Sequence, residues 1–162
     1  MKTKNLTPSE DFKINLNRTL RFLSFRPRSE KEISDYLKKK QVDPVISQKI
    51  ILKLKESNFL NDEEFAKWWI EQRTLIKPRA WRIIRLELRA KGISDEIIQD
   101  SELKVQDDGE IAIKLAEKKI SRYKNLPKQE AYQKLGRYLS SKGFNWEIIK
   151  KSIDEIFSKE YN

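Results

Sequence analysis

The sequence predicts an all-α protein made of three tandem three-helix repeats with a period of about 51 residues. Residues 88–98 read LRAKGISDEII, residues 139–149 read LSSKGFNWEII, and residues 37–47, LKKKQVDPVIS, follow the same pattern more loosely. Four Gly and five Pro in 162 residues supply few turns for a β-rich fold, which also favours helices. Because each repeat needs a neighbour to bury its apolar face, we expect an elongated, curved array.

The repeat boundaries follow from this period. We expect a flexible N-terminal tail over residues 1–11, a first repeat over 12–62, a second over 63–109 and a third over 110–162 with a frayed C-terminus. The first helix of each repeat has the loosest pattern, and these helices are expected near residues 15–25, 63–75 and 111–123. Asn61 or Asp62 is the predicted N-cap of the middle one, because both side chains accept backbone N–H groups well.

The second helix of each repeat has recognisable ends. Ser29 and Glu32 have the spacing of a capping box at the start of the first such helix. Gly92 and Gly143 fit the position just after the last turn, where a left-handed backbone is needed. Gln41 stands at that place in the first repeat, so the same turn is expected there at some conformational cost.

The third helix of each repeat is announced by a good N-cap residue. Asp43, Ser94 and Asn145 recur at intervals of 51 residues, and each can accept a free N–H of the first turn. Trp146 follows the last cap and is expected in the core. The third helix of the second repeat runs into residues 101–109, SELKVQDDG, which are poor in apolar side chains. That segment is expected to be partly exposed or to act as a hinge.

The composition limits the classes of function. The absence of Cys and His removes disulfides, thiol nucleophiles, the usual zinc ligands and the commonest general base. An all-carboxylate metal site stays open, but nothing in the sequence calls for a metal, a cofactor or catalysis, and a non-enzymatic protein is expected. No apolar run is long enough to span a membrane and no signal core is visible, so the cytoplasm is the expected location. The net charge of +10 indicates a polyanionic partner, either nucleic acid or an acidic protein surface.

Basic residues gather at related places in the three repeats. In the helix expected over residues 78–92, Arg82, Arg85 and Arg89 form a stripe between two apolar faces, which favours an outward direction. A solvated face with Glu87 as a local ion-pair partner is the alternative. Arginine suits bidentate contacts with phosphate or carboxylate. The candidate partner-contact residues are therefore Arg26, Arg28, Lys77, Arg79, Arg82, Arg85, Arg89, Lys118, Lys119, Arg122 and Lys124.

Two adjacent tryptophans, Trp68 and Trp69, lie in the first helix of the second repeat. Neighbouring residues of a helix cannot share one face, so one is expected in the core and the other between repeats. The alternative is that the second tryptophan is an aromatic anchor for a partner, because exposed aromatic side chains are frequent at interface hot spots.

Four segments of the chain are distinctive in combination and in order: RFLSFRPRSEKEISDYL (21–37), LNDEEFAKWWI (60–70), KPRAWRIIRLELRAKGI (77–93) and YLSSKGF (138–144). With these segments the sequence resembles the RecX family of bacterial RecA regulators, and the resemblance extends over nearly the whole chain. The resemblance implies three tandem three-helix repeats in an elongated, curved molecule that binds the RecA filament on single-stranded DNA. A monomer is expected. The resemblance also implies suppression of ATP hydrolysis, strand exchange and coprotease activity, with some members binding DNA, single-stranded or double-stranded.

Two other functions stay open from the residues alone. A general DNA-binding protein would use residues 79–103 as a helix-turn-helix, but the would-be recognition helix carries acidic side chains that repel phosphate. These side chains are Asp95, Glu96, Asp100 and Glu102. An all-α scaffold with protein partners only is the third option. Strongly salt-dependent affinity for naked DNA would distinguish the DNA-binding protein from the others.

Overall fold

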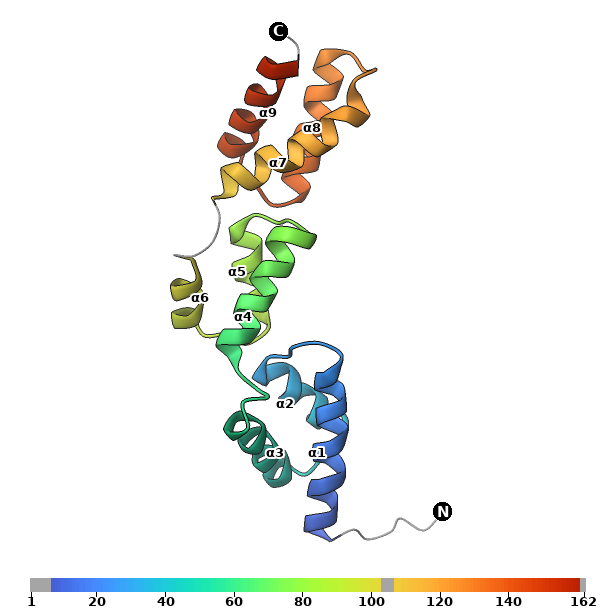
Figure 1. Cartoon of the computed structure of the whole chain (residues 1–162), viewed down its shortest axis with the longest axis vertical. Helices are drawn as coiled ribbons and strands as arrows, with labels where there is room; N and C mark the ends of the chain where they lie inside the picture. Colours follow the sequence, from blue (N-terminus) through green and yellow to red (C-terminus); the bar gives the residue numbers. More distant parts are fainter. Residues whose placement is uncertain (1–6, 103–106, 161–162) are drawn as a thin grey trace. The chain divides into compact units, whose positions relative to one another are not determined.

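The computed structural model describes residues 7–102 and 107–160 and contains only helices and turns within those ranges (Figure 1). The prediction of an all-α chain of three three-helix repeats is confirmed. The first repeat comprises α1 (Pro8–Ser24), α2 (Glu30–Lys39) and α3 (Pro44–Glu56). The second comprises α4 (Asp62–Glu71), the π-helix η1 (Gln72–Ile76), α5 (Trp81–Ala90) and α6 (Asp95–Glu102). The third comprises α7 (Asp108–Ile120), the short 3₁₀-helix η2 (Ser121–Tyr123), α8 (Lys128–Ser141) and α9 (Trp146–Glu160).

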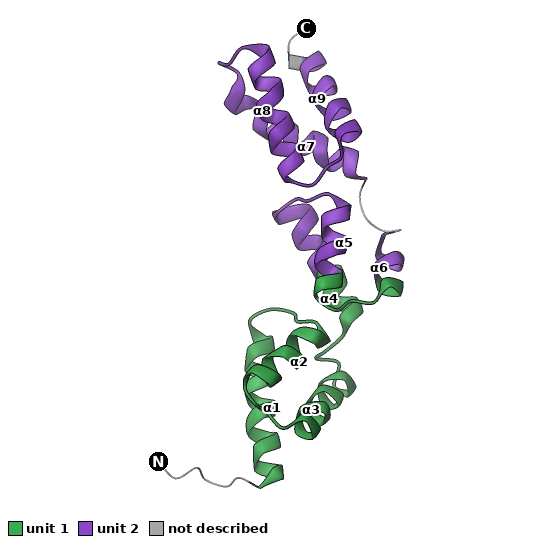
Figure 2. Cartoon of the chain, turned by 180° about the vertical axis from the view of Figure 1, so that it is seen from behind, with its two compact units in different colours: residues 1–68, 89–97 green, residues 69–88, 98–162 purple. Residues whose placement is uncertain are grey.

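The chain divides into two compact units, and the residues of the second repeat are split between them (Figure 2). Unit 1 contains residues 1–68 and 89–97, and unit 2 contains residues 69–88 and 98–162. Unit 1 thus combines the first repeat with the turn after α5, whereas unit 2 combines most of α5 with the third repeat.

Each unit has its own apolar core. In unit 1, five fully or nearly fully buried side chains from α2, α3 and the loop after α3 form the centre, and α1 packs on them. They are Ile33, Leu37, Ile50, Leu54 and Leu60. In unit 2, the core is built mainly from α7, α8 and α9, with Leu115, Leu135 and Ile153 among its buried side chains. Burial of such apolar area is the main force that holds each three-helix repeat together.

The helix ends agree closely with the predicted caps. Ser29 and Glu32 form a complete capping box. Asp43 accepts the N–H groups of the first turn of α3, Asn61 caps α4, and Asn145 accepts an N–H at the start of α9. Gly92 and Gly143 have positive φ angles of 81° and 96°, and Gln41 adopts the same kind of turn with a φ of 56°. The repeat therefore keeps its turn geometry even where Gly is absent.

Two predictions about the ends of elements need correction. α1 begins at Pro8, with Thr7 as its N-cap, so it takes in residues 8–11 that the sequence assigned to the tail. Trp146 is 63% exposed rather than buried. It is the first residue of α9, and helical side chains lean toward the N-terminus, so its indole extends beyond the core. The possible hinge after α6 falls largely on residues 103–106, which lie outside the described residues.

Candidate functional site

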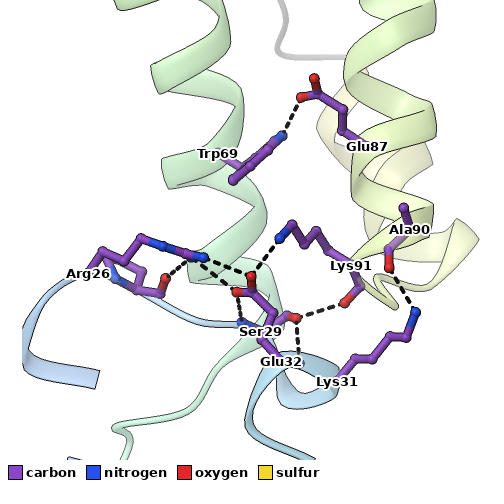
Figure 3. A network of polar contacts seen from close by, with 9 residues as sticks. Arg26, Ser29, Lys31, Glu32, Trp69, Glu87, Ala90 and Lys91 are labelled. Atoms are coloured by element: carbon purple, nitrogen blue, oxygen red, sulfur yellow. Dashed lines mark hydrogen bonds and ion pairs between the residues drawn. The ribbon is translucent and has the colours of Figure 1, made fainter. Parts of the chain in front are cut away.

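The candidate residues Arg26 and Arg28 belong to a polar cluster of unit 1, termed here the first joint and formed by residues 26–32 and 89–92. Figure 3 shows Arg26 with Ser29, Lys31, Glu32, Ala90 and Lys91. Ser29 Oγ donates to the carbonyl oxygen of Lys91 at 2.7 Å, and Lys31 Nζ donates to that of Ala90 at 2.9 Å. The N-terminal end of α2 is thus docked on the backbone carbonyls of the turn that follows α5.

A single carboxylate, Glu32, pairs with two cations of the first joint. Glu32 accepts hydrogen bonds from Arg26 at 2.8 and 3.0 Å and from Lys91 at 2.6 Å (Figure 3). Burial acts to raise the pKa of the Glu32 carboxyl, but the hydrogen bonds and positive charges of Arg26 and Lys91 outweigh it and lower the pKa to about 2. Arg28 lies over the ring of Phe22 at 3.8 Å, and burial together with the charge of Arg26 lowers its pKa. Three basic side chains of the first joint, Arg26, Arg28 and Lys91, therefore interact with Glu32.

The candidates Arg79 and Arg82 lie in an equivalent cluster of unit 2, the second joint, formed by residues 79–83 and 141–143. Arg79 Nη1 donates to the carbonyl oxygen of Ser141 at 2.9 Å, and Arg82 Nε donates to that of Gly143. The backbone N–H of Ala80 donates to the carbonyl oxygen of Lys142 at 3.0 Å. Ser29 and Ala80 are 51 residues apart, and so are Lys91 and Lys142. The two joints therefore use equivalent positions of successive repeats, a helix start and the turn on which it docks.

An aspartate reinforces each joint in the same way. Asp62 accepts the first N–H of α2, from Glu30, at 2.8 Å, and Asp108 accepts the first N–H of α5, from Trp81, at 2.8 Å. Each aspartate is the first residue of a following helix, α4 or α7, and stands where the positive end of the earlier helix favours a carboxylate. Burial raises the pKa of both carboxyls, partly offset by these hydrogen bonds.

The glycines of the two turns are required by close approach as well as by φ. A Cβ atom added at Gly92 would lie 2.7 Å from Lys31 Cβ, and one added at Gly143 would overlap Ile83 Cγ1. Gln41, in the equivalent turn of the first repeat, is exposed and has room for its side chain. The glycine pattern seen in the sequence therefore marks the turns on which a helix start is docked.

The second joint differs from the first in leaving its cations without a carboxylate. Ile83 occupies the register of Glu32. Lys142 lies 5.3 Å and Lys119 lies 4.8 Å from the ring centre of Tyr138, and neither is ion-paired within residues 7–102 and 107–160. Burial and the positive charges of Arg79 and Lys119 lower the pKa of the Lys142 ammonium. We call Arg79, Lys119 and Lys142 the cationic cluster; its electrostatics favour an external anion.

The arginine stripe of α5 faces outward only in part. Arg82 donates to Gly143, and Arg89 forms an exposed ion pair with Asp95 at 2.7 Å. Arg85 is half-buried, and its Nε atom has no hydrogen-bond partner among the described residues. Glu87 pairs with Arg73 rather than with the stripe.

The remaining basic candidates lie in unit 2. Lys77, Lys118 and Arg122 are exposed and form no ion pair with the described part of the chain. Lys124 is exposed at the end of the turn after η2. Lys118 and Lys119 end α7, where positive charge also stabilises the helix terminus. The sequence thus singled out Arg79 and Lys119 but missed Lys142, although its 51-residue match to Lys91 was visible.

The two tryptophans are each half-buried and have different surroundings. In unit 1, Trp68 packs against Phe65 with ring centres 5.9 Å apart and lies under Arg26. In unit 2, Trp69 Nε1 donates to Glu87 at 2.8 Å, and Arg73 lies 4.8 Å from its ring centre. Both rings therefore take part in internal packing, and their proposed use as anchors stays a prediction.

Two further features of the described residues bear on the class of protein. None of the described helices has the length and apolar character needed to cross a membrane. Likewise, no group of three or more acidic side chains within these residues is arranged to hold a metal ion.

The chain matches three family models that together account for most of its length. They are the first three-helix domain of RecX over residues 16–54, the second over residues 61–101 and the third over residues 106–153. The chain belongs to the RecX family. Each model describes one three-helix domain, in agreement with the three repeats of the fold.

Curated relatives and solved structures carry the same name. The chain is 35% identical over 149 residues to the regulatory protein RecX of Bacillus subtilis, covering 91% of this chain and 56% of that protein. It is 36% identical over 140 residues to that of Streptococcus uberis, covering 86% and 54% respectively. The chain thus spans little more than half the length of these relatives. The crystal structure of RecX from Lactobacillus salivarius matches with a TM-score of 0.74 and 29% identity, covering 91% of this chain and 97% of that one.

Proposed function

We propose that this RecX chain regulates RecA by binding the RecA filament on single-stranded DNA and inhibiting its ATPase, recombinase and coprotease activities. The RecA partner follows from the family resemblance. The observation on this chain that best supports a polyanionic surface as its target is the cationic cluster, whose three basic side chains have no carboxylate partner among the described residues. Net charge of +10 adds a general attraction to such a surface.

The way in which the cluster would act follows from its position. Arg79 and Lys142 are fixed by the second joint, since one donates to Ser141 and the backbone of the other accepts from Ala80. The charge of Arg79 is therefore held in place before the partner arrives, which limits the entropy lost on binding. Contacts with phosphate or with acidic side chains would relieve the mutual repulsion of Arg79, Lys119 and Lys142. The filament would thereby be blocked in extension or in access to its groove.

The first experiment is a titration of the chain into RecA hydrolysing ATP on single-stranded DNA. We expect inhibition by the native chain and a clear rise in the concentration needed by a Lys119→Gln/Lys142→Gln variant. If these two charges contact phosphates, their removal would also reduce the slope of log affinity for the filament against log salt concentration by about 2. The matched control is Lys38→Gln/Lys39→Gln, which removes the same charge from the last turn of α2. Equal inhibition by the native chain and both variants would contradict the role of the cluster, and no inhibition by the native chain would contradict the function.

A further inference from the structure

Unit 2 contains a cavity of about 420 Å³ between α8 and the start of α9 that the cationic cluster does not use. Its floor includes the buried side chains of Phe144 and Ile149, and Trp146 stands at its edge with 63% of its surface exposed. The remaining lining residues are Tyr132, Gln133, Gly136, Arg137 and Ser140.

Gly136 keeps this cavity open at a cost to the helix. It lies in the interior of α8, where Gly is less stable than Ala because the unfolded chain gains freedom. Its φ angle is not positive, and an added Cβ atom would lie 3.8 Å from Ile153 Cδ1, which is ordinary contact. Neither the backbone nor the packing therefore requires Gly here. The same register carries Ser34 in the first repeat and Arg85 in the second.

The walls of the cavity combine three kinds of group. Trp146 offers a flat indole that stacks on no other aromatic ring of the described residues. Gln133 and Ser140 offer an amide and a hydroxyl, and neither side chain has a hydrogen-bond partner within the described ranges. Arg137 is exposed at the edge, and its guanidinium has no ion pair in the same ranges. A flat ring, neutral hydrogen-bonding groups and a free cation are the three elements that recognise a base with its phosphate.

We propose that this cavity binds one unstacked base of single-stranded DNA. The base stacks on Trp146, its edge bonds to Gln133 and Ser140, and Arg137 contacts the adjacent phosphate. Gly136 allows the base to approach the backbone of α8. An apolar protein side chain would fill the floor equally well but would make no use of Gln133, Ser140 and Arg137, which are exposed around it. The proposal rests on single-stranded DNA being among the partners in the proposed function.

The test is fluorescence anisotropy of a labelled oligothymidylate with the full chain, compared with an abasic oligomer of the same length. Trp146→Ala should weaken oligothymidylate binding by roughly 5- to 150-fold, since loss of stacking costs about 1–3 kcal/mol per base. Gly136→Leu, which fills the cavity, should weaken it similarly, whereas both variants should bind the abasic oligomer like the native chain. Trp146→Phe should restore much of the affinity. The matched control for added bulk is Ser34→Leu, in the same register of the first repeat, with no effect expected.

Each alternative outcome overturns the proposal in a recognisable way. Unchanged oligothymidylate binding by Trp146→Ala and Gly136→Leu, with circular dichroism showing native helix content, would contradict the base-binding site. The proposed inhibition of RecA is tested separately by the ATPase titration. If the native chain binds both oligomers equally, no base is recognised. If Gly136→Leu loses RecA inhibition but keeps oligothymidylate binding, the cavity takes a protein side chain instead.

Discussion

The two joints use the same geometry with a different balance of charge. In each joint, the start of the second helix of one repeat contacts the turn after the second helix of the next repeat: α2 contacts the turn after α5, and α5 contacts the turn after α8. In each joint, an aspartate also accepts the first backbone N–H of the docked helix. In the first joint, Glu32 balances Arg26 and Lys91. In the second, Ile83 occupies that register, and Lys142 is left beside other cations. The side chain at this one register, Glu32 or Ile83, therefore decides whether the cations beside the backbone contact are neutralised or remain available to an anion.

The largest effect should come from the turn glycine of the second joint. Gly143→Ala should lower the free energy of unfolding by roughly 2–4 kcal/mol, because its Cβ overlaps the branched side chain of Ile83 and its φ is 96°. Urea unfolding followed by circular dichroism measures this. Gln41→Gly is the matched control in the undocked turn and should be neutral or slightly stabilising, since its φ of 56° favours Gly. A loss below about 1 kcal/mol in Gly143→Ala would show that the second joint can open without cost.

The next largest effect should come from Glu32, the carboxylate that pairs with Arg26 and Lys91 in the first joint. Glu32→Gln should cost about 1–3 kcal/mol, because Arg26 and Lys91 lose their shared acceptor while the side-chain shape is kept. The measurement is again urea unfolding, with Glu130→Gln, an exposed pair with Lys134 on α8, as the control of near-zero effect. Equal losses in the two variants would mean that the cluster is no stronger than a surface pair.

The pH dependence should separate the two joints. The Glu32 pKa is about 2 in the folded chain against an ordinary 4.5, so its stabilisation is complete above the unfolded pKa and is lost as the pH falls from about 4.5 to 2. Asp62 and Asp108 have raised pKa values, so their ionisation opposes folding, and this penalty fades at acid pH in both joints. The difference in stability between the native chain and Glu32→Gln should therefore shrink between pH 6 and pH 3. A constant difference would contradict the lowered pKa.

The smallest effect compares two side chains in the same register, Lys31 and Arg82. Each donates to a backbone carbonyl of its joint, from Nζ and Nε respectively. Arg82→Met should cost about 0.5–1.5 kcal/mol, a typical net hydrogen-bond contribution. Lys31→Met should cost less, since an exposed ammonium exchanges its protein partner for water easily. Thermal unfolding of both variants checks the order, which would be contradicted by a larger loss for Lys31→Met.

Features that depend only on residues adjacent in the chain, such as helix caps and turns, could be predicted from the sequence. The caps at Ser29, Asp43 and Asn145, and the left-handed turns at Gly92 and Gly143, are local choices of backbone conformation, and all were found where expected. The fold class follows from them together with the repeat. Even Gln41 keeps the expected turn, because a modest conformational cost is small against the packing of the repeat.

The partners of the candidate side chains could not be predicted in this way. Arg79 and Arg82 bond to carbonyl oxygens about sixty residues away, and every residue has such an acceptor, so no residue type marks the contact. Trp146 directly follows the cap Asn145 and is predicted in the core, but its place at the very start of α9 directs the indole past the core. Such positions require the distances between elements, which periodicity alone does not contain.

Docking on carbonyl oxygens also has a consequence for how such a chain can evolve. The turn after α5 and the turn after α8 offer the incoming helix the same main-chain acceptors, whatever side chains surround them. Gene duplication of one 51-residue unit would therefore copy both halves of a working contact, the donating helix start and the accepting turn with its glycine. Later substitutions such as Glu32 or Ile83 can then diversify the chemistry of each copy without redesign of the attachment.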